Sequence, residues 1–242
     1  MPSVAWASGD ANAQNTLAYY YTGNQIVEMP VQQDHAEAAR WSRRAAEQGD
    51  VVGQCNLGAA YLTGRGVEKS DAEAAKLLRM AAEKGNAIAQ TNLALMYLTG
   101  EGVSKNPNDA VEWYQLAAEQ GNAVAQWALG IIFQGSHGIS PNHTLSVKWL
   151  REASLNSKFN AMDQLGLSYY TGKGVAKNEV EGLAWLKVKT GLGHHTDGHE
   201  NSEGIRQTME RALGPEKTAA AQARCYELVR EISARKRAKT AK

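Results

Sequence analysis

Residues 92–103 read Asn-Leu-Ala-Leu-Met-Tyr-Leu-Thr-Gly-Glu-Gly-Val, and this run decides the fold because the chain repeats it. A close copy at 56–67 reads Asn-Leu-Gly-Ala-Ala-Tyr-Leu-Thr-Gly-Arg-Gly-Val, and another at 164–175 reads Gln-Leu-Gly-Leu-Ser-Tyr-Tyr-Thr-Gly-Lys-Gly-Val. A fourth copy begins at 128 but has Ser136 where the first turn glycine belongs. The copies recur about every 36 residues, which is a period typical of helix-pair solenoids.

A second motif follows each copy at a fixed distance. It ends in Ala-Ala-Glu-x-Gly at 45–49, 81–85 and 117–121. Apolar residues recur at helical spacing both before the Gly-x-Gly turn and before this closing motif, so each copy predicts two helices, A and B. Glycine in the turn indicates backbone with positive φ, and the glycine after helix B suits a helix C-terminus. Each copy is therefore a helix–turn–helix unit that buries its neighbour's apolar face.

These motifs resemble the Sel1-like repeat family, a relative of the tetratricopeptide repeat. The resemblance implies an all-α, right-handed α-α superhelix, or solenoid, whose concave face is lined mainly by A helices. It also implies an adaptor or scaffold role in bacteria, in signalling, envelope assembly or host contact. We delimit a solenoid over 9–193, with copies at 9–48, 49–84, 85–120, 121–156 and 157–193.

Residues 194–242 depart from the repeat. A polar loop leads into a helix expected to end at Gly214, and Pro215 suits the first turn of a second helix that runs to about Ser233. We expect its stripe Ala219, Ala223, Tyr226 and Val229 to cap the open solenoid. The basic residues after Ser233 predict a solvated tail.

The composition excludes several classes of protein. The 242 residues carry a net charge of +1, which argues against nucleic acid or anionic lipid held by bulk charge. No apolar run is long enough to predict a membrane span. Cys55 and Cys225 lie far apart, which disfavours a disulfide scaffold or a zinc ribbon, and Cys55 is expected to be buried as a small hydrophobe.

The N-terminus leaves the location of the protein open. Residues 1–7 lack the basic and long apolar regions of a signal peptide, yet Ala5-Trp6-Ala7 has the form of a cleavage site. We expect a periplasmic or secreted protein if an upstream signal peptide has been removed, and a cytoplasmic protein otherwise.

One cluster could carry chemistry. His194, His195, Asp197 and His199 are residue types that bind zinc, copper or nickel. They lie on a glycine-flanked loop rather than on rigid elements, which favours solvated histidines. We expect no enzyme, no bound metal and no cofactor.

The positions that vary between copies indicate a binding surface. One line along helix A differs from copy to copy, and we predict that it lies on the concave face and contacts a protein partner. The alternative is that this line packs on the neighbouring A helix. The predicted partner-binding residues are Tyr19, Leu62, Leu95, Leu98, Trp127, Ile131, Gln134, Asp163, Leu167 and Tyr170.

The sequence therefore predicts a non-enzymatic protein–protein interaction module. An immunity or inhibitor protein and an envelope scaffold are narrower forms of this hypothesis. The alternatives are a metal-dependent hydrolase that uses the cluster at 194–199, and a glycan- or peptidoglycan-binding protein that uses Tyr19, Tyr20, Trp127 and Tyr170. A poorly capped first copy favours a monomer or a weak dimer.

Overall fold

The computed structural model describes residues 11, 14–16, 18, 34–192 and 200–240. Within these residues all regular secondary structure is α-helical, so the predicted all-α solenoid of helix hairpins is confirmed. The helices are α2 (His35–Glu47), α3 (Val51–Thr63), α4 (Asp71–Glu83), α5 (Ala87–Thr99), α6 (Pro107–Glu119), α7 (Ala123–Ile132), α8 (His143–Leu155), α9 (Phe159–Thr171), α10 (Glu179–Gly191) and α11 (Glu200–Thr240).

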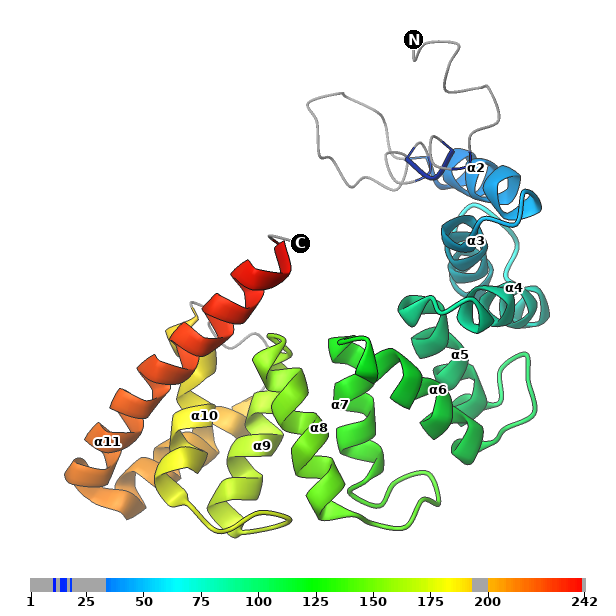
Figure 1. Ribbon diagram of the computed structural model, residues 1–242. Coiled ribbons are helices and arrows are strands. Elements are labelled where there is room, and N and C mark those ends of the chain that lie inside the picture. Colours follow the sequence, from blue (N-terminus) through cyan, green and yellow to red (C-terminus); the bar gives the residue numbers. More distant parts are fainter. Residues whose placement is uncertain (1–10, 12–13, 17, 19–33, 193–199, 241–242) are drawn as a thin grey trace. The chain divides into compact units, whose positions relative to one another are not determined.

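The chain forms two compact units, one up to Gln120 and one from Gly121. In the first unit, each helix from α2 to α6 packs on the next, and in the second unit α7 to α11 do the same (Figure 1). The A helices also contact across one hairpin, α3 with α5 in the first unit and α7 with α9 in the second. Contacts of this nearest-neighbour kind are what stacked repeats require.

The Gly-x-Gly turn has the backbone that the sequence predicts. Gly100 caps α5 in the left-handed region with φ 85°, and its N–H donates to the carbonyl of Met96. Gly102 also has positive φ, and a Cβ there would lie 2.1 Å from the carbonyl oxygen of Asp71. Glycine is therefore needed because the turn of one repeat lies directly against helix B of the repeat before it.

The small residue in the middle of helix A lets helix B approach closely, as predicted. A Cβ on Gly130 of α7 would lie 2.6 Å from Leu150 Cδ2 of α8. Gly58 faces Leu78, and Gly166 faces Leu186, in the same way. Each of these leucines therefore fills the space that a larger side chain on helix A would take.

A buried glutamine recurs at one position of α3, α5 and α7, and on α5 it joins neighbouring hairpins. Gln90 Nε2 donates to the carbonyl of Ala82 in the preceding helix at 3.1 Å, and Gln90 Oε1 accepts from Gln120 Nε2 at 2.8 Å. The equivalent Gln54 is fully buried, but Lys84 stands where Gln120 stands one repeat later. Neither amide atom of Gln54 has a hydrogen-bond partner among the described residues.

The C-terminal helix is divided at Gly214, whose φ of 75° and ψ of 176° are not helical, as the sequence predicts. The predicted capping stripe is wrong, however. Tyr226 is 57% exposed, and the residues that pack into the core of the second unit lie on a neighbouring stripe. These buried residues are Ala221, Cys225, Leu228 and Ile232.

The basic residues after Ser233 form a helix rather than a frayed tail, although Lys236, Arg237 and Lys239 are exposed to solvent as predicted. Helix α11 continues to Thr240, and Arg235 donates to Glu152 of α8 at 2.7 Å. Lys239 Nζ donates to Asn156 Oδ1, also at 2.7 Å. These contacts join the end of α11 to α8, 83 residues earlier in the chain.

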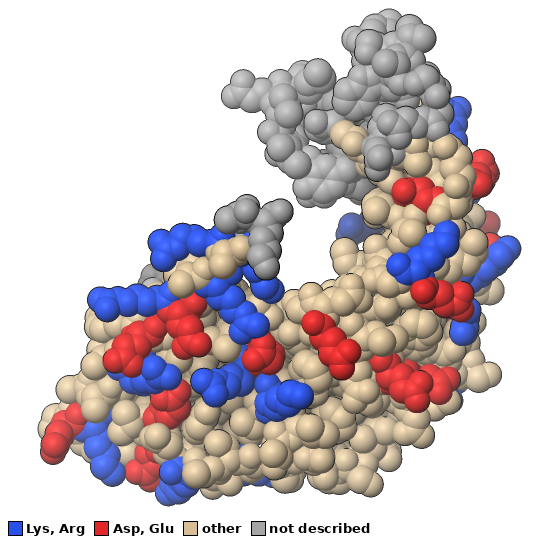
Figure 2. Space-filling model, in the orientation of Figure 1, with Lys and Arg blue, Asp and Glu red and all other residues tan. Residues whose placement is uncertain are grey.

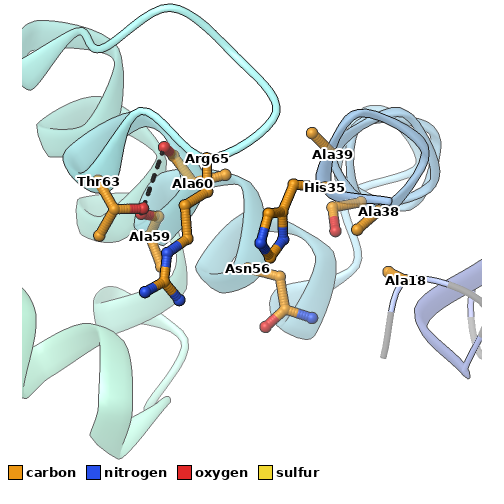
Figure 3. A pocket seen from close by; sticks show the side chains of 10 residues that line it. Ala18, His35, Ala38, Ala39, Asn56, Ala59, Ala60, Thr63 and Arg65 are labelled. Atoms are coloured by element: carbon orange, nitrogen blue, oxygen red, sulfur yellow. Dashed lines mark hydrogen bonds between the residues drawn. The ribbon is translucent and has the colours of Figure 1, made fainter. Parts of the chain in front are cut away.

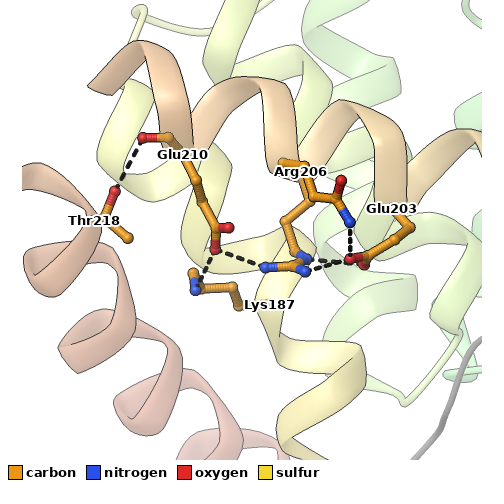
Figure 4. A network of polar contacts seen from close by, with 6 residues as sticks. Lys187, Glu203, Arg206, Glu210 and Thr218 are labelled. Carbon is orange, nitrogen blue, oxygen red and sulfur yellow. Dashed lines mark hydrogen bonds and ion pairs between the residues drawn. The ribbon is translucent and has the colours of Figure 1, made fainter. Parts of the chain in front are cut away.

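A network of charges attaches the first part of α11 to α10 (Figure 4). Lys187 of α10 pairs with Glu210 at 2.6 Å, and Arg206 pairs with both Glu210 and Glu203. The hydrogen bond from Arg206, with a second from Gln207, lowers the pKa of Glu203 to about 2. Glu203 is therefore ionised throughout the physiological range.

Candidate functional site

One line along the A helices exposes apolar side chains in each unit. On α5 this line runs through Ile88, Asn92, Leu95 and Thr99, and Ile88 and Leu95 are 59% and 49% exposed. Large apolar residues recur there at Val52 of α3, Val124 of α7 and Leu167 of α9. We call the exposed lines on α3 and α5, and on α7 and α9, the helix-A faces of the two units. Five of the eight exposed large apolar side chains of the described chain lie on them.

The predicted partner-binding residues divide between these faces and the interior. Leu95, Ile131 and Leu167 lie on the helix-A faces, and Ile131 is partly exposed. Leu98 is only 7% exposed, so its side chain takes part in packing between helices. Tyr19 lies outside the described residues. Four more predicted residues are partly exposed: Leu62, Gln134, Asp163 and Tyr170.

Trp127 and Tyr170 pack against the core of the second unit rather than standing clear of it. Lys158 Nζ lies 5.2 Å from the centre of the Trp127 ring, and Lys177 Nζ lies 5.8 Å from the Tyr170 ring. Trp127 Nε1 is buried without a hydrogen-bond partner in the part of the chain that the structure describes. A cation over each ring stabilises it in place and occupies a face that another ligand would need.

Sequence reasoning missed Val52, Ile88 and Val124. Each stands two residues after the Asp or Asn that caps helix A, and they recur at the repeat period. That recurrence of an apolar residue in a first helical turn is the signal that could have found them. The predicted line through Leu95 and Leu98 shares only Leu95 with the exposed line, because Leu98 and Thr99 are neighbours in sequence and therefore point in different directions around the helix.

A pocket of about 500 Å³ opens beside helix α3 in the first unit (Figure 3). Apart from Ala18, the side chains around it come from α2, α3 and the turn that follows α3, and they include His35, Asn56, Thr63 and Arg65. The hydroxyl of Thr63 donates to the carbonyl of Ala59 at 2.9 Å, as the dashed line shows. Polar side chains and alanines are thus interspersed around the pocket.

A second pocket, of about 490 Å³, lies between α8 and α9 in the second unit. Leu167 of the helix-A face forms part of its wall, so the pocket and the exposed apolar line adjoin. The other lining residues are Gln134, His143, Ser146, Gln164, Ser168, Thr171 and Lys173.

Groups capable of chemistry are few in the described chain. Cys55 is buried, and burial raises the pKa of its thiol to about 11, so it packs as a small hydrophobe, as predicted. Burial also raises the pKa of Cys225. No group of three metal-ligating side chains occurs within 34–192 or 200–240. The cluster His194, His195, Asp197 and His199 lies outside the described residues.

Charges of both signs are interspersed over the molecular face in view (Figure 2). None of the helices that the structure describes is long and apolar enough to cross a bilayer.

Comparison with known proteins agrees with the fold. A Sel1 repeat protein of Oxalobacter formigenes superposes with a TM-score of 0.73 at 26% identity, over 94% of this chain and 88% of that one. A Klebsiella pneumoniae protein described as a putative Sel1 repeat protein gives 0.54 at 19% identity, over 86% and 96%. A protective antigen of uropathogenic Escherichia coli with the same fold superposes with a TM-score of 0.53 at 24% identity, over 98% of this chain and 64% of that one.

A search of curated proteins found no significant match. The family model for the Sel1 repeat matches five times, at residues 11–50, 51–86, 87–122, 123–157 and 160–187. Proteins built from this repeat generally bind other proteins and are typically not enzymes. With most of its length in five such matches, this chain belongs to the Sel1 repeat family.

Proposed function

We propose that this protein is a non-enzymatic adaptor that binds another protein through its helix-A faces. Residues 9–193 carry the binding surface in this proposal, and 194–242 cap the last repeat. The observation that carries the proposal is the recurrence of exposed apolar side chains at equivalent places in successive A helices, which hold five of the eight exposed large apolar side chains of the described residues. Exposed apolar side chains that gather on one face are typical of interaction sites.

The chemistry of these faces suits a protein better than a small molecule. Each exposed Leu, Ile or Val is flanked along its helix by a small or polar residue, such as Asn92 and Thr99 beside Leu95. Burying one such apolar side chain contributes about 1.5–3 kcal/mol. A partner that covers several of them gains affinity from anchors spread along the repeats, with polar groups between them.

The two alternatives have less support. The hydrolase hypothesis rests on His194, His195, Asp197 and His199; metal analysis and a His195→Ala/His199→Ala double variant test it. The glycan hypothesis needs open aromatic faces, but Trp127 and Tyr170 pack against the core and carry lysines over their rings. Titration with soluble peptidoglycan fragments tests that hypothesis.

The experiment uses the full chain as bait and compares it with surface variants. Leu95→Asp and Leu167→Asp place a charge on the helix-A face of each unit. Leu116→Asp and Tyr226→Ser are matched controls, because these residues are similarly exposed but lie on α6 and α11. A protein that is retained by the wild type and both controls, and lost with a helix-A variant, is then purified and titrated by calorimetry.

Proteins retained equally by all four variants would contradict the proposal. Stoichiometry separates the two narrower roles. A one-to-one complex that blocks the partner's own activity is the result expected of an immunity or inhibitor protein. Simultaneous binding of two different proteins is the result expected of an envelope scaffold.

A further inference from the structure

The two pockets are built from equivalent positions three repeats apart. Each has a histidine at the first residue of helix B, a threonine at the last residue of helix A and a cation two residues later. An amide side chain stands in the middle of helix A in both. The equivalent residues are His35 and His143, Asn56 and Gln164, Thr63 and Thr171, and Arg65 and Lys173.

The cation in each pocket is not neutralised by its surroundings. Neither Arg65 nor Lys173 forms an ion pair with the residues that the structure describes, and no Asp or Glu lines either pocket. Nearby lysines differ in this respect, since Lys177 pairs with Glu179 at 2.9 Å and Lys69 pairs with Asp71 at 3.4 Å. Each pocket therefore keeps a positive charge that no acidic side chain of the described residues neutralises.

This charge is not a general property of the repeat. One repeat after His35 and Arg65, the equivalent positions hold Asp71 and Glu101. Two acidic residues therefore stand in the first unit at the positions equivalent to a histidine and an arginine one repeat earlier. Because the backbone of the repeat is the same, these sites differ in the charge of the ligand that each can attract.

The polar groups of the second pocket leave hydrogen-bond donors free. Gln164 Oε1 accepts from Gln134 Nε2 at 3.4 Å, and Gln164 Nε2 has no partner in the described chain. The hydroxyls of Ser168 and Thr171 donate to carbonyls of their own helix, each at 2.8 Å. What remains for a ligand is the ammonium of Lys173, the amide N–H of Gln164 and the imidazole of His143, which together suit an acceptor with negative charge.

We infer that the second pocket binds the carboxylate of an Asp or Glu side chain from the protein partner. This inference rests on the proposed function and deepens it. Lys173 supplies the opposing charge, Gln164 Nε2 donates a hydrogen bond, and the start of α8 at His143 adds the positive end of a helix dipole. Leu167 borders the pocket, so an acidic residue beside an apolar one in the partner meets both features.

The test uses two small probes with the ¹⁵N-labelled full chain. N-acetyl-glutamic acid α-amide carries the carboxylate, and N-acetyl-glutamine α-amide is its neutral isostere. We expect the acidic probe to produce saturable shifts of the backbone amide signals of Gln164, Thr171 and Lys173, and the neutral probe to produce none. Lys173→Gln should weaken binding of the acidic probe by up to about fivefold, the upper end of the range for an exposed ion pair.

Lys177→Gln is the matched control, because it removes the same charge four residues along the same loop. It should leave binding unchanged. Equal shifts with both probes, no saturable shift at these amides, or equal weakening by Lys173→Gln and Lys177→Gln would overturn the inference. If the acidic probe does not bind but the protein still binds a partner through its helix-A faces, only the carboxylate site is refuted. If the acidic probe binds but no protein partner is found, the proposed function is refuted.

Discussion

Leu95 and Leu98 lie one turn apart on α5, yet Leu95 is 49% exposed and Leu98 is 7% exposed. The two side chains therefore have different roles in the same helix. Leu98 stabilises the packing between helices, and Leu95 belongs to the surface that the protein offers to others. Only a structure separates them, because both are leucines at variable positions of the repeat.

This relationship predicts opposite outcomes for two alanine variants. Leu98→Ala should lower the free energy of unfolding by about 2–4 kcal/mol, because it leaves a cavity between packed helices. Leu95→Ala should change the free energy of unfolding by less than about 0.5 kcal/mol, as for other surface substitutions. Chemical denaturation of both variants measures the difference. Similar destabilisation by both would show that the α5 face is packed and not free.

The turn glycines predict a second pair of outcomes. Gly102 and Gly85 both have positive φ, but a Cβ on Gly102 would meet the carbonyl of Asp71 at 2.1 Å, whereas Gly85 has nothing within 4 Å. Gly85→Ala should lower the free energy of unfolding by about 1–2 kcal/mol, which is the strain of the left-handed backbone alone. Gly102→Ala should lower the free energy of unfolding by clearly more than Gly85→Ala, since the backbone at Asp71 must also move. Thermal unfolding compares them, and equal losses would refute the close approach of successive repeats.

The buried glutamines predict a third contrast. Gln90 makes hydrogen bonds to Ala82 and Gln120, so Gln90→Leu should destabilise the protein by about 1–3 kcal/mol. Gln54 makes none with the described residues, so Gln54→Leu should be neutral or stabilising. Urea unfolding at one pH measures both. A loss in Gln54→Leu as large as that in Gln90→Leu would reveal a partner for Gln54.

The Arg206–Glu203 pair predicts a dependence of stability on pH. The pKa of Glu203 in the folded state is about 2, which is lower than the ordinary value of 4.5. The Glu203 carboxylate therefore stabilises the fold above about pH 4.5, and this contribution is lost as the pH falls toward 2. The Tm difference between wild type and Glu203→Gln should therefore shrink over that range. Arg206→Gln should flatten the same dependence. A difference that stays constant from pH 5 to pH 2 would contradict the assignment. The effect is small because both side chains remain partly exposed to solvent.

Much of the fold was predictable because it depends on local rules repeated along the chain. The turn at Gly100 and Gly102, and the small residue at Gly130, each follow from a steric requirement that recurs at the repeat period. The division of the last helix at Gly214 and Pro215 follows from the same kind of local rule. These features need no knowledge of distant contacts.

The helix-A faces and the C-terminal cap were harder to predict because they depend on which helix packs beside them. Along α11, the stripe through Tyr226 and the stripe through Cys225 have the same spacing, and only the position of α10 buries the second. Arg235 pairs with Glu152, 83 residues earlier, and charge alone gives no sign of such a partner. On α5, the same uncertainty placed Leu98 with the predicted binding residues.

Binding of a protein partner by the helix-A faces is measured by calorimetry. The purified partner, found with the full chain, is titrated into wild type, Leu95→Asp, Leu167→Asp, Leu116→Asp and Tyr226→Ser. We expect at least one helix-A variant to raise the Kd tenfold or more, equivalent to about 1.4 kcal/mol, with an unchanged melting temperature. We expect Leu116→Asp and Tyr226→Ser to bind as the wild type does. Wild-type affinity in both helix-A variants, or a loss confined to Leu116→Asp or Tyr226→Ser, would contradict binding through the helix-A faces.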